Sequence, residues 1–193
     1  MLWLCLGCLF VGTVTAQVPF LGGCPNVDTV QDFNTQKYLG KWYEAERYFA
    51  IFEFGGKCVT ATYDTNANGT VSVINKQISS LSGVASSIKG FATQRASDRA
   101  KLGVVFPSLP VQFEAPYWIL DTDYTSYAVV WSCSDYGIIS ARNAWILTRE
   151  QHPPISVLEK AYQVVDKNKI SRAFFVRTDQ KNCVEPPETN HVI

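Results

Sequence analysis

Apolar and polar residues alternate with a period of two through the chain from Lys41 to Arg149. In one such row, Val59, Ala61 and Tyr63 alternate with threonines. Turn sequences, among them Asn-Gly and Ser-Gly pairs, separate the rows. The clearest rows fall at 59–63, 71–75, 102–106, 118–120, 129–131 and 145–147. Alternation with regularly spaced turns predicts about eight antiparallel strands, in a barrel or in a sandwich.

The pattern changes after Arg149. The two prolines at 153–154 are unsuited to a strand but are tolerated in the first turn of a helix. The apolar residues that follow recur at intervals of three and four, at Ile155, Leu158, Tyr162 and Val165. This spacing predicts an α-helix over about 155–167 with one apolar face, packed against the outside of the sheet. A short final strand is expected at about 173–177.

Eight antiparallel strands can close into a barrel, which removes their exposed edges. A barrel of that size is either filled by its own side chains or holds one small ligand. The rows expected to face inward carry large rings and few polar groups: Tyr63, Asn75, Phe106, Trp118, Trp131 and Trp145. Such a lining suits a pocket for an apolar ligand, and it also suits a packed core. The alternation by itself leaves both interpretations open.

The beginning of the chain predicts the cellular route of the protein. Residues 1–16 have no charged side chain, an apolar run from Leu2 to Val14, and the small residue Ala16 at their end. The run is shorter than the about 20 residues that a membrane-spanning helix needs. We therefore expect a signal peptide at 1–16 and a secreted protein over 17–193. That length suits a single domain.

Four cysteines remain after this cleavage: Cys24, Cys58, Cys133 and Cys183. An even number in an oxidising compartment predicts two disulfides, and four cysteines allow three pairings. The spacing of the cysteines does not choose among the pairings. The sequence Asn68-Gly69-Thr70 is an acceptor for N-glycosylation in a stretch rich in turn residues, so Asn68 is a candidate for modification at an exposed turn.

The charges and histidines exclude several classes of function. Seventeen basic and seventeen acidic residues cancel, so the chain has no positive surplus for binding nucleic acid. The two histidines, His152 and His191, are too far apart in the sequence to indicate a histidine-rich metal site. Glu44 and Glu46 on the first strand could act as an acid–base pair inside a barrel, although such carboxylates more often make hydrogen bonds or face solvent.

Three motifs occur in a fixed order along the predicted barrel. The first strand begins with Gly40-Lys41-Trp42, Thr122-Asp123-Tyr124 follows the sixth strand, and Arg149 ends the eighth. Together these motifs resemble the signature of the lipocalin family, and the resemblance covers essentially the whole mature chain. It implies an all-β fold: an eight-stranded antiparallel up-and-down barrel over about 40–149, with one helix outside it.

The resemblance assigns structural roles to Gly40, Trp42, Asp123 and Arg149. A barrel with one closed end needs a bulky plug there, which Trp42 can supply. Arg149 can lay its guanidinium over that indole in a cation–π contact. The resemblance also implies two disulfides, Cys24–Cys133 and Cys58–Cys183, which would tie the N-terminal arm and the C-terminal tail to the barrel.

The resemblance further implies a ligand that enters the open end of the barrel. The residues at the matching positions are Tyr38, Tyr63, Asn75, Phe106, Trp118, Val129, Trp145 and Leu147. The implied function is a secreted carrier of a small hydrophobic molecule, such as a fatty acid, another lipid, a steroid or a retinoid, without a cofactor. The alternative is a carrier of a bilin pigment such as biliverdin. Catalysis is not expected, because all four mature cysteines match disulfide positions and leave no free thiolate.

Two apolar stretches, 48–54 and 104–113, fall in loops at the expected open end of the barrel. A monomeric protein usually exposes fewer large apolar residues in its loops than these two stretches contain. Either these stretches fold over the mouth of the barrel as a lid, or they contact lipid particles or membrane surfaces.

Overall fold

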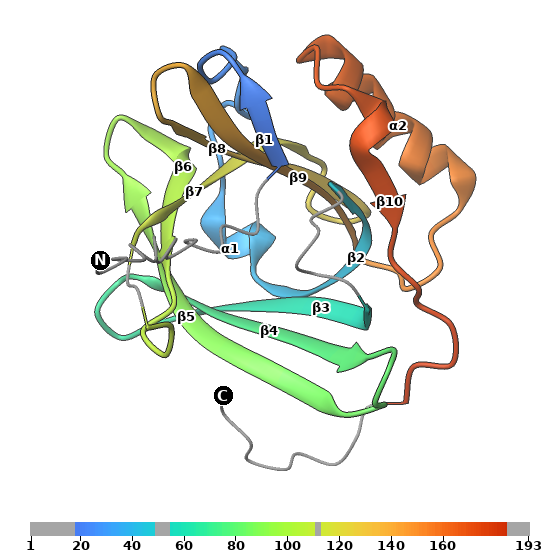
Figure 1. Ribbon diagram of the computed structural model, residues 1–193. Coiled ribbons are helices and arrows are strands. Elements are labelled where there is room, and N and C mark those ends of the chain that lie inside the picture. Colours follow the sequence, from blue (N-terminus) through green and yellow to red (C-terminus); the bar gives the residue numbers. More distant parts are fainter. Residues whose placement is uncertain (1–17, 49–54, 111–112, 185–193) are drawn as a thin grey trace, which may run out of the picture.

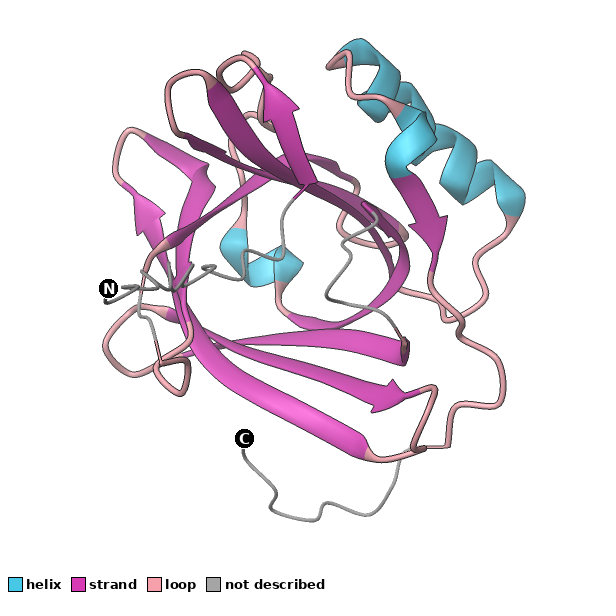
Figure 2. Cartoon of the chain, viewed as in Figure 1, coloured by secondary structure: helices cyan, strands magenta, loops and turns pink. Residues whose placement is uncertain are grey.

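A computed structural model describes residues 18–48, 55–110 and 113–184 of the chain. Strands dominate these residues, and helices lie at few places among them (Figure 2). The barrel strands are β2 (Gly40–Tyr48), β3 (Gly56–Thr65), β4 (Val71–Ser79), β5 (Ala85–Arg95), β6 (Asp98–Val105), β7 (Ala115–Thr122), β8 (Tyr127–Asp135) and β9 (Ile139–Thr148). The other elements are β1 (Val18–Leu21), α1 (Thr35–Tyr38), α2 (Ile155–Lys167), a 3-10 helix (Arg172–Phe174) and β10 (Phe175–Arg177).

Strands β2 to β9 form a closed antiparallel barrel (Figure 1). Each strand pairs with the next along the chain, and β9 returns to β2, where Thr148 lies opposite Tyr43. The predicted eight-stranded up-and-down barrel is therefore confirmed. β1 and β10 extend the sheet beyond this closure, because β1 pairs with β9 and β10 pairs with β2.

The strands present one face to the barrel interior and one face outward, because successive side chains point in opposite directions. In β4, Val71 and Val73 are buried while the residues beside them are partly exposed. β8 differs, since every residue from Tyr127 to Cys133 is buried. Its inner side chains face the barrel interior and its outer side chains meet α2, so polarity no longer alternates in this strand.

α2 packs against the outside of β7 and β8, over the residues that the sequence predicts (Figure 2). Pro154 precedes its first turn, where a missing N–H costs no hydrogen bond. The buried face of the helix consists of Leu158, Ala161, Val164 and Val165. This face joins Val129, Trp131 and Ile146 in a hydrophobic cluster that we call the outer cluster. Burial of each large aliphatic side chain favours docking of the helix by about 1.5–3 kcal/mol.

The last strand begins later than the sequence predicts. The 3-10 helix at Arg172–Phe174 occupies the start of the expected strand, and β10 runs only from Phe175 to Arg177. The hydroxyl of Ser171 accepts a hydrogen bond from the N–H of Ala173, which caps this turn. A serine in this position favours the turn over an extended chain.

Trp42 and Arg149 close one end of the barrel beside α1. The indole of Trp42 is fully buried, and its Nε1 donates a hydrogen bond of 2.9 Å to the carbonyl of Tyr38. The Arg149 guanidinium lies 3.7 Å from the centre of the Trp42 ring. It also donates hydrogen bonds to the backbone carbonyls of Lys37, Tyr38, Leu39, Lys41 and Tyr124. One side chain thus connects α1, the start of β2 and the β7–β8 turn.

Gly40 and Asp123 hold the backbone around this stack. Gly40 has a φ angle of +95°, and a Cβ atom there would lie 3.3 Å from Nη1 of Arg149. The Asp123 carboxylate accepts hydrogen bonds from the N–H groups of Thr125, Ser126 and Tyr127 in the β7–β8 turn. Burial alone would raise the pKa of Asp123, but the hydrogen bonds from Ser126 and its neighbours lower it. All four signature residues therefore have structural partners.

Two disulfides, Cys24–Cys133 and Cys58–Cys183, tie the chain ends to the barrel. This is the pairing that the family resemblance implies. The bonded cysteines are 109 and 125 residues apart, so each bond closes a long loop. In the chain-entropy model, a loop of that length contributes about 4–5 kcal/mol to stability.

We expect Trp42→Ala to lower the free energy of unfolding by about 3–5 kcal/mol, because it leaves a cavity beneath Arg149. Urea unfolding followed by circular dichroism measures the change. Tyr136→Ala is the control, since this side chain is 59% exposed in the β8–β9 turn and its loss should cost less than about 0.5 kcal/mol. Equal urea midpoints for Trp42→Ala and the unmodified protein would contradict the role of Trp42 as the plug.

Candidate ligand-binding site

The inner face of the barrel carries a hydrophobic cluster built around Trp42, which we call the inner cluster. Side chains from α1 and from several barrel strands contribute to it. Five of the residues that the sequence predicts as ligand contacts belong to it or pack against it: Tyr38, Tyr63, Phe106, Trp145 and Leu147. The structure brings these five together on one face, and their contact with a ligand stays a prediction.

Three tyrosines of the inner face form a chain of hydroxyl groups. Tyr117 Oη lies 3.0 Å from Tyr38 Oη and 2.6 Å from Tyr63 Oη. Burial raises the pKa of Tyr63 to about 12 and raises the pKa values of Tyr38 and Tyr117 well above the usual range of tyrosine. All three hydroxyls are therefore protonated at neutral pH and can donate hydrogen bonds. We call Tyr38, Tyr63 and Tyr117 the tyrosine trio.

Aromatic side chains continue the inner face beyond the tyrosine trio. The Trp145 ring stacks on Tyr117 with ring centroids 6.3 Å apart and an interplanar angle of 27°. Phe106 lies over Gly90, where a Cβ atom would come within 2.7 Å of the phenyl ring. Glycine at that position in β5 therefore makes room for the ring of Phe106.

Asn75 supplies a polar atom on β4, the strand next to that of Tyr63. It pairs with Ala61 across β3 and β4, so both side chains share the inner face. Its Oδ1 atom is buried and has no hydrogen-bond partner within the described residues. A buried amide oxygen without a donor is costly, so this atom is suited to a polar group of a bound molecule.

A β-bulge in β2 turns two charged side chains toward the barrel interior. The register of the β2–β9 pair shifts after Glu44, so that Glu44 lies opposite Leu147 and Arg47 lies opposite Trp145. Leu147 and Trp145 both belong to the inner face. Residues three apart in a regular strand would point to opposite faces, so the bulge is what places Glu44 and Arg47 together.

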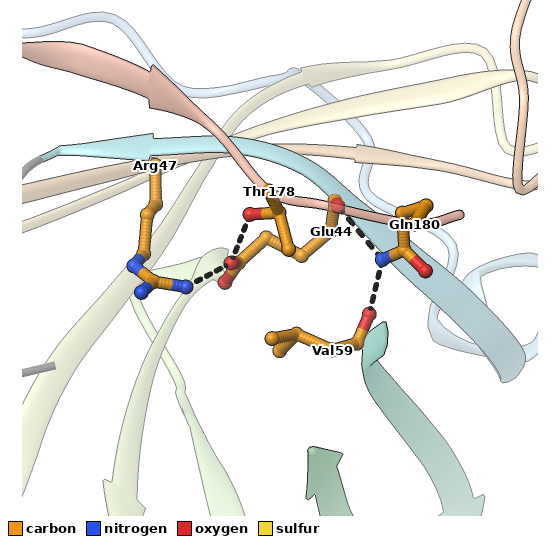
Figure 3. Close-up of polar contacts among 5 residues, drawn as sticks. All are labelled: Glu44, Arg47, Val59, Thr178 and Gln180. Carbon is orange, nitrogen blue, oxygen red and sulfur yellow. Dashed lines mark hydrogen bonds and ion pairs between the residues drawn. The ribbon is translucent and has the colours of Figure 1, made fainter. Parts of the chain in front are cut away.

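Glu44 and Arg47 form a buried ion pair that also contacts the C-terminal segment (Figure 3). Arg47 Nη1 lies 2.6 Å from Glu44 Oε1, and the same oxygen accepts a hydrogen bond of 2.5 Å from the Thr178 hydroxyl. Glu44 is only 6% exposed and Arg47 only 9%. Each charge is therefore balanced by the other and not by solvent.

Gln180 closes a gap in the barrel wall between β2 and β3. The pairing of these strands ends at Tyr43 and Thr60, beyond which β2 pairs with β10. The Gln180 side-chain amide donates hydrogen bonds of 3.0 Å to the Glu44 carbonyl and 2.8 Å to the Val59 carbonyl (Figure 3). This side chain thus takes the place of a missing backbone hydrogen bond.

Two residues predicted to face inward, Trp118 and Val129, belong to the outer cluster. The same error affects Trp131, which lies opposite Trp118 in the β7–β8 pair. Their neighbours Tyr117, Ile119, Ala128 and Val130 face inward instead. The physical reason is that α2 covers the outside of these strands, so both faces are apolar and alternation cannot distinguish inside from outside.

Sequence reasoning also missed Tyr117 and Arg47 as inner residues. Tyr117 precedes Trp118 in an apolar string, and the correct face for Trp118 would have identified Tyr117 as its inward neighbour. No sequence signal identified Arg47 as an inner residue, because its inward direction depends on the β-bulge and the sequence around the bulge does not predict a bulge there.

The acid–base pair considered for Glu44 and Glu46 is wrong, since the two carboxylates occupy opposite faces of β2. Glu46 lies opposite Ile146 of the outer cluster and accepts a hydrogen bond of 2.6 Å from the Tyr162 hydroxyl. Within the described ranges, no cluster of His, Cys, Asp and Glu side chains could hold a metal ion. No helix among those residues is long and apolar enough to cross a membrane.

The turns at the open end of the barrel, opposite Trp42, expose large apolar side chains. The β4–β5, β6–β7 and β8–β9 turns share this end, because consecutive strands are antiparallel. Leu81 is 97% exposed and Ile138 is 85% exposed. Other exposed apolar residues of this end include Val84, Leu109, Phe113, Tyr136 and Ile139.

The two apolar stretches of the sequence have different outcomes. Of the stretch 48–54, the structure describes Tyr48, which is buried in the outer cluster, and 49–54 lie outside the described residues. The stretch 104–113 divides, because Val104 belongs to the inner cluster while Leu109 and Phe113 are exposed.

Asn68 is exposed in the turn between β3 and β4, at the closed end of the barrel. Its Oδ1 accepts hydrogen bonds from the N–H and the hydroxyl of Thr70, at 3.1 Å and 2.8 Å. The acceptor amide is thus at a surface turn beside its threonine. Modification at this position stays a prediction.

Known proteins resemble this chain in sequence and in structure. Residues 33–180 match the model of the lipocalin-like domain. The chain is 38% identical to apolipoprotein D of Mus musculus over 173 residues, which are 89% of each chain. It is 32% identical to the Lazarillo protein of Schistocerca americana over 164 residues, 82% of this chain and 75% of that relative. The structure of insecticyanin from the tobacco hornworm Manduca sexta aligns with a TM-score of 0.74 at 25% identity, covering 84% of this chain and 89% of insecticyanin.

Proposed function

Because the chain belongs to the lipocalin family, we propose that it is a secreted carrier that holds one small hydrophobic molecule on the inner face of its barrel. The observation that carries this proposal is the make-up of that face. Aromatic rings surround a few polar atoms, and one of them, Asn75 Oδ1, has no partner within the described part of the chain. A molecule with an apolar body and a polar group would bury the rings and satisfy that atom.

A fatty acid, another lipid, a steroid or a retinoid has this combination of groups, and biliverdin is the alternative ligand. Trp145 and Phe106 supply apolar area, and the tyrosine trio and Asn75 supply hydrogen bonds that orient the ligand. We propose a carrier and not an enzyme. The support for this is that the four mature cysteines are bonded in pairs and that Glu44 and Glu46 point to opposite faces of β2.

We expect a long-chain fatty acid or a steroid to change tryptophan fluorescence in a saturable way, because Trp145 lies on the inner face. Titration of the unmodified protein, Trp145→Phe and Trp118→Phe measures the effect. Trp145→Phe should remove most of the change, while Trp118→Phe should retain it, since Trp118 lies outside the barrel. Tight binding of biliverdin alone, with a shift of its visible absorption band, would indicate that the ligand is a bilin and not a lipid. No response to any ligand would contradict the carrier.

We also propose that the apolar turns of the open end contact lipid surfaces, where a hydrophobic ligand is loaded or released. Three turns at one end expose large apolar residues, whereas the chain has no net charge to attract it to anionic lipids. Contact would therefore depend on apolar burial and not on charge. The alternative is a lid that these segments form over the mouth of the barrel.

We expect Leu81→Ser/Ile138→Ser to reduce co-sedimentation with phosphatidylcholine vesicles severalfold, because it removes two of the most exposed apolar side chains of the open end. Ile155→Ser is the matched control, since Ile155 is 70% exposed at the start of α2, away from the open end. Equal pelleting of the double variant and the control would leave the lid as the better account.

Secretion and N-glycosylation complete the proposal. The two disulfides support an oxidising compartment, and the exposed turn at Asn68 supports modification. We expect the protein secreted from a eukaryotic host to begin at Gln17 and to lose mass on treatment with peptide N-glycosidase. Intact-mass measurement checks both points, with Asn68→Gln as the control that has no glycan to lose. A secreted protein that retains residues 1–16 would contradict the signal peptide.

A further inference from the structure

The tyrosine trio has more hydrogen-bond donors than it uses internally. Three hydroxyl groups carry three hydrogens, and the two contacts between them, at 3.0 Å and 2.6 Å, use two. One hydrogen is left over whichever way each hydroxyl points. Among the described residues, these three oxygens have no other hydrogen-bond partner. The inner face therefore offers one O–H donor to an acceptor that the chain itself does not supply.

The ion pair on the same face offers no net charge to a ligand. Arg47 Nη1 lies 2.6 Å from Glu44, and Thr178 stabilises the same carboxylate oxygen from the C-terminal segment. A ligand carboxylate that approached Arg47 would also approach the Glu44 carboxylate. Burial of an ionised group is costly unless an opposite charge compensates it, and here the positive charge is already compensated.

We propose that this barrel selects uncharged apolar ligands that carry a hydrogen-bond acceptor, with the tyrosine trio as the donor and Glu44 as the residue that excludes anions. The inference rests on the proposed carrier function and narrows it. Ketones, esters and aldehydes of apolar molecules fit this description. Ionised fatty acids do not, because they bring a second negative charge to the Glu44–Arg47 pair.

Three compounds of fifteen carbons test the donor and the charge separately. 2-Pentadecanone has an acceptor without charge, pentadecane has neither, and pentadecanoate at pH 8 has a charge. Each is titrated by tryptophan fluorescence into the unmodified, full-length secreted protein and its variants. Affinities are compared between variants for one compound at a time, because the three compounds differ in their free energies of transfer out of water.

The first variant, Tyr38→Phe/Tyr63→Phe/Tyr117→Phe, removes all three hydroxyls at once, so none is left buried without a partner. We expect it to weaken binding of 2-pentadecanone about three- to tenfold, as for one neutral hydrogen bond, and to leave pentadecane unchanged. Tyr43→Phe is the matched control, because Tyr43 lies opposite Thr148, outside the inner cluster. The carbonyl carbon of ¹³C-labelled ketone should shift upfield in the triple variant, where the hydrogen bond is lost, and not in the control.

The second variant, Glu44→Gln, removes the negative charge beside Arg47 while keeping the shape of the side chain. We expect it to strengthen binding of pentadecanoate about tenfold or more and to change binding of the ketone less than about twofold. Unchanged binding of pentadecanoate in Glu44→Gln, or an unchanged carbonyl resonance in the triple variant, would overturn the inference and leave the carrier function standing. Failure of all three compounds to bind would instead contradict the carrier itself.

Discussion

Five backbone carbonyls converge on the Arg149 guanidinium while its face covers the buried Trp42 ring. These carbonyls belong to α1, to the residue that follows it, to the start of β2 and to the β7–β8 turn. Buried carbonyls need partners, and arginine is the side chain with enough N–H groups in one plane to serve several of them. Arg149 thus supplies hydrogen-bond donors to the carbonyls of the segments that cross this end of the barrel.

The closed end includes paired positions of three neighbouring strands, β2, β3 and β9. With Trp42 opposite Ala61 and Tyr43 opposite Thr148, the inner positions of β2, β3 and β9 are fixed. A slip of one residue would turn every inner side chain outward. Tyr63, Trp145 and Glu44 lie on these three strands and face the interior in this register, while Arg47 faces it because of the β-bulge.

The sequence was sufficient to predict the architecture and the inward direction of most of the predicted ligand contacts, with Trp118 and Val129 as the exceptions. In strands that are solvated on one face, such as β4, the alternation of apolar and polar residues shows which face points inward, and the apolar spacing of α2 predicts a helix. In β8 the alternation is lost, because α2 and the barrel interior bury both faces of the strand, and the prediction therefore placed Val129 on the wrong face. The direction of Arg47 depends on a β-bulge, and the contact of Glu44 with Thr178 joins residues 134 positions apart. Neither is a local property of the sequence.

The hydrogen bonds of Gln180 determine when the barrel wall can be completed during synthesis of the chain. Its amide joins Glu44 and Val59, which precede it by 136 and 121 residues. A ribosome releases β2 and β3 long before it releases the residue that seals the wall between them. Cys58 likewise cannot form its disulfide until Cys183 has been synthesised. The nascent chain can pair its eight barrel strands and still have an unsealed wall until the segment that contains Gln180 has been synthesised, so this later segment completes the barrel wall.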